Sequence, residues 1–248
     1  MKERLNKWLS RMGICSRREA DRLIEAGRVM VDGVPASMGQ KVSPGQSVVC
    51  DGKMIPFGTR EEPRPVLLAV NKPRGIVCTT SQKDRAENIV EYLKYPERIY
   101  PVGRLDKESE GLLLMTNQGD LVNKIMRSGN AHEKEYVVTV DSPVTDVFLG
   151  RMADGVYLEE LDTTTRPCRV QKTDDNTFTI ILTQGLNRQI RRMCQACGCR
   201  VRRLKRVRIM NINLGSLKTG ESREVTPEEY RELTRLLAGS TNLPHGGQ

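Results

Sequence analysis

The sequence predicts an α+β protein in two parts: a small N-terminal module, and a larger domain whose mixed, mainly antiparallel sheet is flanked by helices. The first part combines two amphipathic helices with short strands. A polar, Pro-containing stretch without periodicity then interrupts the pattern. Beyond it, period-two strands and apolar runs are separated by helices without a regular βαβ rhythm, which is typical of α+β domains.

The N-terminal module is predicted at residues 1–58. Ser16 followed by Glu19 has the spacing of a capping box, which marks the start of its second helix. Each strand ends in an Asp-Gly turn. The expected elements are helices at 4–12 and 16–27 and strands at 29–31 and 46–50.

A linker is predicted at residues 59–65, the larger domain at 66–238 and a disordered tail at 239–248. The last helix opens with an N-cap threonine and a proline at its first position. Its apolar side chains, all expected to be buried, are Tyr230, Leu233, Leu236 and Leu237. The expected elements of the domain are strands at 66–70, 112–115, 135–141 and 177–183 and helices at 187–197 and 226–239.

The composition limits the classes of function. The chain has 248 residues, 40 Lys plus Arg and 31 Asp plus Glu, so its net charge of +9 favours a polyanionic partner. No apolar run approaches the roughly 18 residues of a membrane span, and the charged N-terminus is unlike a secretory signal. Seven cysteines, an odd number, are typical of cytoplasmic thiols rather than a disulfide framework. We expect a cytoplasmic monomer.

Basic residues form two clusters that contain few acids. Residues 185–210 carry nine basic side chains and no acid, and a second cluster lies on the N-terminal helices. One such run is compatible with a solvated face, whereas two favour a polyphosphate ligand. Three Phe, six Tyr and one Trp are too few for a base-stacking platform, so backbone recognition of structured RNA fits better. The residues expected to contact RNA are Arg4, Lys7, Arg17, Arg18, Arg22, Arg188 and Arg192.

The segment GRLDKESEGLLLMTNQG at 103–119 is the most informative part of the sequence. It places Asp106 in a loop just before a buried strand, between Arg104 and Lys107. Neighbouring cations favour the ionised carboxylate. Taken alone, the composition of the segment favours a surface ion-pair loop.

This segment resembles the second motif of the RsuA-type bacterial rRNA pseudouridine synthases. NKPRG at 71–75 resembles their first motif, KEY at 134–136 the strand with an active-site tyrosine, and QGLNRQIRRM at 184–193 the third motif. Residues 4–33 resemble an S4 RNA-binding domain. The resemblance covers about residues 3–237 and is greatest to synthases that act on 23S rRNA.

The resemblance implies an isomerase that needs no cofactor and no metal, and it assigns roles to five residues. Asp106 corresponds to the catalytic aspartate, as nucleophile or base, and Arg191 to the arginine that pairs with it. Tyr136 corresponds to the ring that stacks on the target base. Arg104 corresponds to the residue associated with base flipping, and Lys72 supports the loop of Asp106.

Each assignment has an alternative in the residues themselves. Tyr136 alternates with apolar positions and is compatible with a core residue. Glu108 and Glu110 are compatible with a two-carboxylate glycosidase, but no aromatic sugar platform accompanies them. The Cys194, Cys197 and Cys199 spacing is compatible with a zinc knuckle, although it lacks a paired second motif.

The predicted function is site-specific isomerisation of uridine to pseudouridine in 23S ribosomal RNA. One alternative is a synthase directed to tRNA. Another is an RNA-binding ribosome-assembly factor that keeps the fold without catalysis, although Asp106, Tyr136 and Arg191 are all present.

Overall fold

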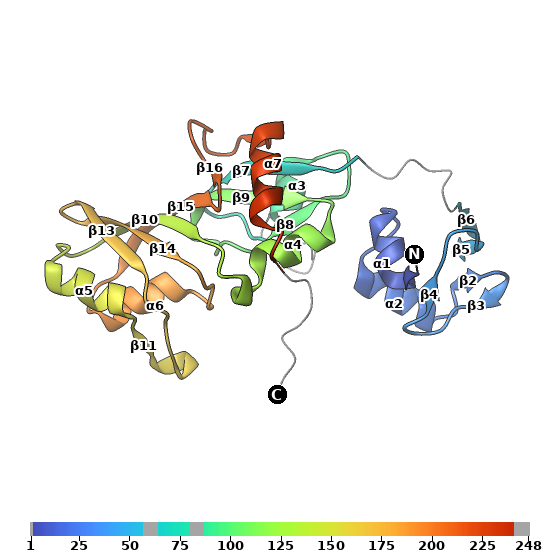
Figure 1. The fold of residues 1–248 in the computed structure, drawn as a ribbon, viewed down its shortest axis with the longest axis horizontal. Helices are drawn as coiled ribbons and strands as arrows, with labels where there is room; N and C mark the ends of the chain where they lie inside the picture. Colours follow the sequence, from blue (N-terminus) through green and yellow to red (C-terminus); the bar gives the residue numbers. More distant parts are fainter. Residues whose placement is uncertain (1, 57–63, 80–86, 241–248) are drawn as a thin grey trace. The chain divides into compact units, whose positions relative to one another are not determined.

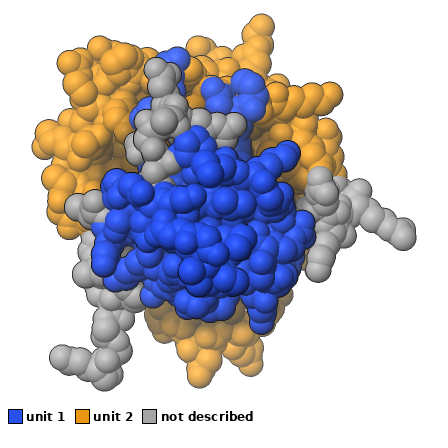
Figure 2. Space-filling view, turned by 90° about the vertical axis from the view of Figure 1, so that its right-hand side faces the viewer, with its two compact units in different colours: residues 1–65, 96–98 blue, residues 66–95, 99–248 orange. Residues whose placement is uncertain are grey.

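The computed structural model describes residues 2–56, 64–79 and 87–240 (Figure 1). The chain forms two compact units, Met1–Pro65 with Pro96–Arg98 and Val66–Tyr95 with Ile99–Gln248, coloured separately in Figure 2. Most of the linker predicted at 59–65, and the tail from residue 241, lie outside the described residues. The two described residues of the predicted tail include Ser240, whose Oγ lies 2.8 Å from Nε2 of His132.

The smaller unit packs two helices against short antiparallel strands. Ser16 accepts a hydrogen bond from the Glu19 N–H, as the cap spacing predicts, while the Glu19 carboxylate accepts from Arg22. Trp8, on the first helix, is buried in the core of this unit. The elements are β1 Glu3–Arg4, α1 Leu5–Arg11, α2 Arg17–Glu25, β2 Val29–Val31, β3 Val34–Pro35, β4 Lys41–Val42, β5 Val48–Cys50 and β6 Lys53–Ile55.

The larger unit is built on a mixed sheet with the order β13-β14-β10-β15-β9-β7-β17 in its described residues. β15 runs parallel to β9, and the other neighbours in this order are antiparallel, so the predicted fold class is confirmed. Two short strands, β8 and β16, pair with β9 and β15. The strands are β7 Leu67–Lys72, β8 Tyr100–Val102, β9 Glu110–Thr116, β10 Lys134–Val140, β13 Arg169–Asp174, β14 Thr177–Leu182, β15 Val201–Ile209, β16 Ile212–Asn213 and β17 Ser222–Glu224.

Helices cover both faces of the sheet (Figure 1). A small hairpin of β11 and β12 completes the unit. The remaining elements are α3 Ile89–Leu93, α4 Gly119–Met126, η1 Ser128–Asn130, α5 Asp146–Asp154, β11 Tyr157–Leu158, η2 Glu159–Leu161, β12 Thr163–Thr164, α6 Gln189–Ala196 and α7 Pro227–Leu236.

β9, like its neighbour β7, is buried along its whole length. Leu112 and Leu114 face a core shared with α4 and α7, while Leu113 and Met115 face the core that contains α3. Because side chains alternate between the two faces and both faces are covered, all seven residues of β9 are buried. This double burial explains the continuous apolar run in the sequence.

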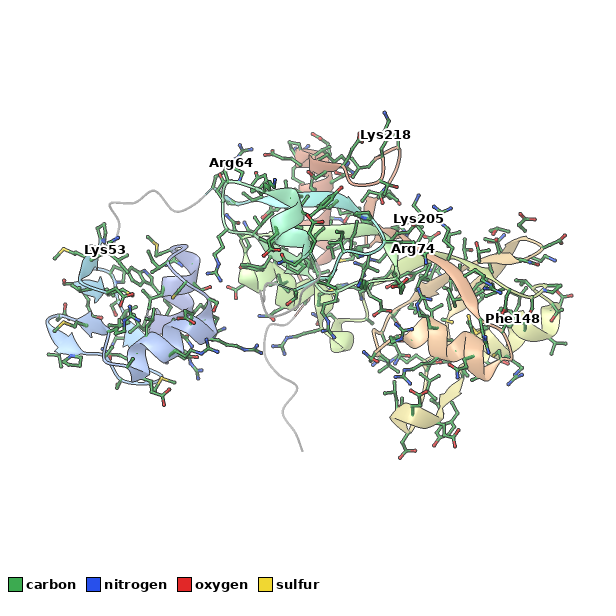
Figure 3. All side chains as sticks on the ribbon, turned by 180° about the vertical axis from the view of Figure 1, so that it is seen from behind. Lys53, Arg64, Arg74, Phe148, Lys205 and Lys218 are labelled. Carbon is green, nitrogen blue, oxygen red and sulfur yellow. The ribbon has the colours of Figure 1, made fainter. Side chains whose placement is uncertain are left out.

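At the other end of the sheet, α5 and α6 pack on β10 and β14. Phe148 of α5, labelled in Figure 3, meets Phe178 edge-on with ring centroids 5.3 Å apart. Met193 and Cys194 of α6 are fully buried, as the helical spacing predicts. Leu233 of α7 and Leu237 just after it are buried, and Tyr230 is half-buried. Leu236 is 39% exposed, so its predicted burial is wrong. It lies just outside the stripe that faces the sheet.

The close approach of β9 to β15 depends on Gly111. Its φ of +100° is a backbone conformation that L side chains rarely adopt. A Cβ there would clash with the Arg206 carbonyl and lie 2.8 Å from the Arg206 nitrogen. The parallel pairing of Arg206 with Gly111 therefore requires glycine.

Gly111→Ala is expected to lower the free energy of unfolding of the larger unit by about 3 kcal/mol or more, because the strands must separate. Urea unfolding followed by far-UV circular dichroism measures the loss. Trp8, the single tryptophan, reports the smaller unit by fluorescence and should be unaffected.

The matched control is Gly198→Ala, whose φ of +86° is similarly strained but whose surroundings are open within 4 Å. Backbone strain alone should cost about 1–2 kcal/mol. Equal losses of unfolding free energy in the two variants would contradict the conclusion that Gly111 is needed for the close approach of β9 to β15.

Candidate active site

The loop that carries Asp106 connects β8 to β9 and is tied to a second loop. The Asp106 carbonyl accepts from the Ser109 N–H at 3.0 Å, which makes a tight turn. The Gly75 N–H donates to the carbonyl of Lys107 at 2.8 Å. Loop 73–76, which follows β7, is thereby joined to the loop of Asp106.

Lys72 fixes loop 73–76 by hydrogen bonds to its backbone. Its buried Nζ donates to the carbonyls of Pro73 and Ile76, both at 2.8 Å. Burial lowers the pKa of this ammonium, and nearby groups that include Asp106 oppose the shift. Lys72 therefore contacts the Asp106 loop only indirectly, through the backbone of the first motif.

Two guanidinium groups from the start of α6 flank the Asp106 carboxylate. Arg191 Nε and Arg188 Nη1 each lie 3.9 Å from its Oδ2. Arg191 also donates from Nη2 to the Glu108 carbonyl at 3.3 Å and to Ser109 Oγ at 3.4 Å. The Asp106 side chain is one-third exposed, whereas that of Arg191 is largely covered.

The Arg191 guanidinium is fixed rather than solvated. Burial lowers its pKa, and Arg188 adds to this, while Asp106 and Glu108 oppose it. The guanidinium is thus a fixed positive charge 3.9 Å from the Asp106 carboxylate.

Asp106 lines a cavity of about 310 Å³ in the larger unit. Arg104 lines it from the same loop, Tyr136 from β10, and Arg188 from segment 184–190, which leads into α6. A cavity of this size with a few polar groups is typical of small-molecule sites.

Two further cations line the cavity, and sequence reasoning missed both. Lys134 of β10 is 5% exposed and Arg206 of β15 is 1% exposed. The Arg206 guanidinium carbon lies 6.0 Å from the centroid of the Tyr136 ring, and its Nε donates to the Leu112 carbonyl at 2.7 Å. For Lys134 the sequence did contain a signal. Side chains alternate along a strand, so Lys134 lies on the same face of β10 as the predicted site residue Tyr136.

Lys134 is an unusually acidic lysine. Its Nζ donates to the His132 carbonyl at 3.1 Å. Burial, and next the charge of Arg206, lower its pKa to about 8.

The predicted site residues are partly brought together. Asp106, Tyr136, Arg104 and Arg188 line the cavity, and Arg191 contacts Asp106 from outside it. Arg192 instead pairs with Glu160 of the β11–β12 hairpin, and its Nε donates to the Asn187 carbonyl at 3.0 Å. The predicted RNA contacts of the smaller unit, exposed except for half-buried Lys7, are Arg4, Lys7, Arg17, Arg18 and Arg22.

The alternative carboxylates and thiols have other partners. Glu110 pairs with Arg203 at 2.6 Å, and Glu108 with Arg74 at 3.5 Å. Cys199 Sγ donates to the Cys194 carbonyl at 3.5 Å inside the core. Within the described part of the chain, no three His, Cys, Asp or Glu side chains are grouped to hold a metal ion.

Comparison with known proteins places this geometry in a family. Residues 66–196 match RNA pseudouridylate synthases, and residues 3–48 match the S4 domain. The dual-specificity RNA pseudouridine synthase RluF of Escherichia coli K12 is 50% identical over 239 residues, covering 96% of this chain and 81% of that protein. Ribosomal large subunit pseudouridine synthase B of Bacillus subtilis is 36% identical over 247 residues, covering 97% and 99%.

A solved structure supports the same conclusion. A crystal structure of a pseudouridylate synthase aligns with a TM-score of 0.67 and 27% identity, covering 93% of this chain and 99% of that one. Fold and matches define an RNA-modifying isomerase with its own RNA-binding domain. The chain belongs to the RNA pseudouridine synthase family, and the S4 domain ahead of the synthase domain confirms the RsuA-type resemblance. Among the described residues, no helix is long and apolar enough to cross a membrane.

Lys134 is expected to titrate near pH 8, against about 10.4 for an ordinary lysine. The measurement is the ¹³Cε shift in lysine-labelled protein, assigned by its loss in Lys134→Met. Because the folded pKa lies below the unfolded one, the unfolded chain binds the proton more tightly between these values, so the stability contribution of Lys134 rises with pH across that window. A midpoint at the ordinary value would contradict its burial.

Proposed function

We propose that the enzyme converts a specific uridine of 23S ribosomal RNA to pseudouridine, with Asp106 as the nucleophile or base. The observation that carries this proposal is the position of its carboxylate, which lines the cavity and lies 3.9 Å from two guanidinium groups. Only an ionised carboxylate can act in either role. The proposal includes action as a monomer in the cytoplasm.

The reaction needs no energy donor. The N1–C1′ bond of the uridine breaks, the base turns within the cavity, and C5 joins C1′. The proton on C5 leaves and N1 takes up a proton, so the product is an isomer of the substrate. The chemistry therefore requires a positioned carboxylate and a closed pocket, and no cofactor.

The neighbouring side chains take distinct roles in this proposal. Arg191 holds and orients the Asp106 carboxylate, and Lys72 acts on the same loop through its backbone. The Tyr136 ring stacks on the extruded base. Arg104, exposed beside the cavity, fills the space that the uridine leaves in the RNA.

The smaller unit anchors the RNA through its backbone. Arg17, Arg18 and Arg22 are exposed on α2, where they can contact phosphates without reading sequence. The name of the Bacillus relative supports a large-subunit ribosomal target. The words dual-specificity in the name of the Escherichia relative support a second class of RNA, for which tRNA is the candidate.

Asp106→Asn is expected to reduce pseudouridine formation by about 10³-fold or more, because the amide is neither a nucleophile nor a base. Affinity for RNA should change little. The measurement is release of tritium from C5 of uridine-labelled 23S rRNA, with binding followed separately. The control, Asp120→Asn, changes an exposed acid on α4 that does not line the cavity.

Normal turnover by Asp106→Asn would refute its proposed role. Binding without tritium release by the wild type would favour the non-catalytic assembly factor. Mapping pseudouridines in ribosomal RNA and tRNA from cells that lack the protein identifies the target, and an unchanged 23S map would refute the ribosomal assignment.

Replacing Arg17, Arg18 and Arg22 together by Gln is expected to weaken RNA binding and leave the rate at saturating RNA unchanged. The slope of log affinity against log salt should fall by about 0.7–0.9 for each phosphate that is no longer neutralised by an arginine. The control is Lys53→Gln, an exposed cation on β6 of the same unit (Figure 3). An unchanged slope in the triple variant would argue against phosphate binding by α2.

A further inference from the structure

We propose that Lys134 and Arg206 together bind a carbonyl oxygen of the target uracil and stabilise the negative charge on the base when it leaves the ribose. This inference rests on the proposed function and extends it to how the base is recognised. It concerns two residues to which the family resemblance gave no role.

Both side chains are built into the cavity wall by the sheet. Lys134 and Tyr136 lie on one face of β10, and Tyr136 is paired in register with Arg206 of β15. The bond from Arg206 Nε to the Leu112 carbonyl fixes the guanidinium on its inner side. Groups held by strands keep their geometry more accurately than groups on loops.

Both side chains also keep donors unused. Arg206 Nη2 is buried and has no hydrogen-bond partner among the described residues. Lys134 Nζ has three donors, and one of them is taken by the His132 carbonyl. Buried donors without partners cost stability, so their presence beside a cavity indicates that a ligand supplies the acceptor.

The chemistry of these donors matches uracil, and at the C4 oxygen it also selects uracil over cytosine. Ammonium and guanidinium groups donate and never accept, so they match the two carbonyl oxygens of uracil. Cytosine has an amino group at C4 in place of the oxygen. That amino group would face the buried cationic donors, and neither side would have an acceptor. The Tyr136 ring, with its centroid 6.0 Å from the Arg206 guanidinium carbon, supplies an apolar face for the base beside these donors.

The same interaction acts on the chemical step. When the N1–C1′ bond breaks, its electron pair stays on the base, and the charge is shared with the carbonyl oxygens at C2 and C4. C5 then forms the bond to C1′, and the C5 proton is lost as N1 gains one. Lys134 and Arg206, which are 5% and 1% exposed, stabilise that charge without reorganising.

A phosphate of the RNA is a poorer fit to this pair. The exposed cations along the cavity are Arg104 and Arg188, which a solvated phosphate can reach. Lys134 and Arg206 are covered and lie beside the aromatic ring. Their position suits a flat, desolvated base better than a charged phosphate.

The test replaces single oxygen atoms of the target uridine by sulfur, a weaker acceptor. Fragments of 23S rRNA carry uridine, 4-thiouridine or 2-thiouridine at the modified position, and single-turnover rates are measured with the wild type and Lys134→Met. For the oxygen that Lys134 binds, sulfur should slow the wild type about tenfold. It should slow Lys134→Met less than about twofold, because the donor is already gone.

The two sulfur positions separate the two carbonyls, and coupling at either one supports the proposal. A structural role for Lys134 would slow all three RNAs equally in the variant. The control is Lys205→Met on β15, labelled in Figure 3. Lys205 does not line the cavity, so this variant should keep the full sulfur effect. Lys134→Gln serves as a second variant if Lys134→Met unfolds at the assay temperature.

Equal sulfur effects in the wild type and in both Lys134 variants, at both positions, would overturn the proposal while leaving the proposed function intact. No pseudouridine from the wild type with the unmodified fragment would instead overturn the proposed function, and this inference with it. The wild-type rate on uridine therefore distinguishes the two failures.

Discussion

The site depends on the parallel pairing of β9 with β15. β9 begins directly after the loop that carries Asp106, and β15 contributes Arg206 to the same cavity. The absence of a side chain at Gly111 lets the two backbones meet, and Arg206 Nε then reaches the Leu112 carbonyl. Strand pairing therefore positions Arg206 relative to the start of β9, and the loop that carries Asp106 leads directly into that start.

The cationic side chains that line the cavity differ in their exposure to solvent. Arg104 and Arg188 remain open to solvent and suit the RNA backbone, whereas Lys134 and Arg206 are covered and suit a neutral base that becomes anionic. The Asp106 side chain is one-third exposed, so its exposure is intermediate between those of the two groups of cations.

The sequence predicted the parts of this structure that depend on local rules. The cap at Ser16 and the buried stripe of α6 follow from spacing, and the middle of β9 follows from its continuous apolar run. The proximity of Asp106 and Arg191 followed only from the family resemblance. Arg206 was missed because it belongs to a run of basic residues that composition assigns to phosphate binding. In the strand, side chains alternate, so this one arginine points inward while exposed Arg203 pairs with Glu110. Whether a charge faces water or a cavity is decided by the partner strands, which periodicity does not reveal.

The self-contained cores of the two units have a further consequence. The apolar cluster of the smaller unit draws only on residues 5–55, and those of the larger unit begin at Val66. Within the described residues, each apolar cluster takes its side chains from a single unit. Replacing the smaller unit by another RNA-binding module would therefore change how tightly the RNA backbone is held and leave the apolar cores around the cavity as they are.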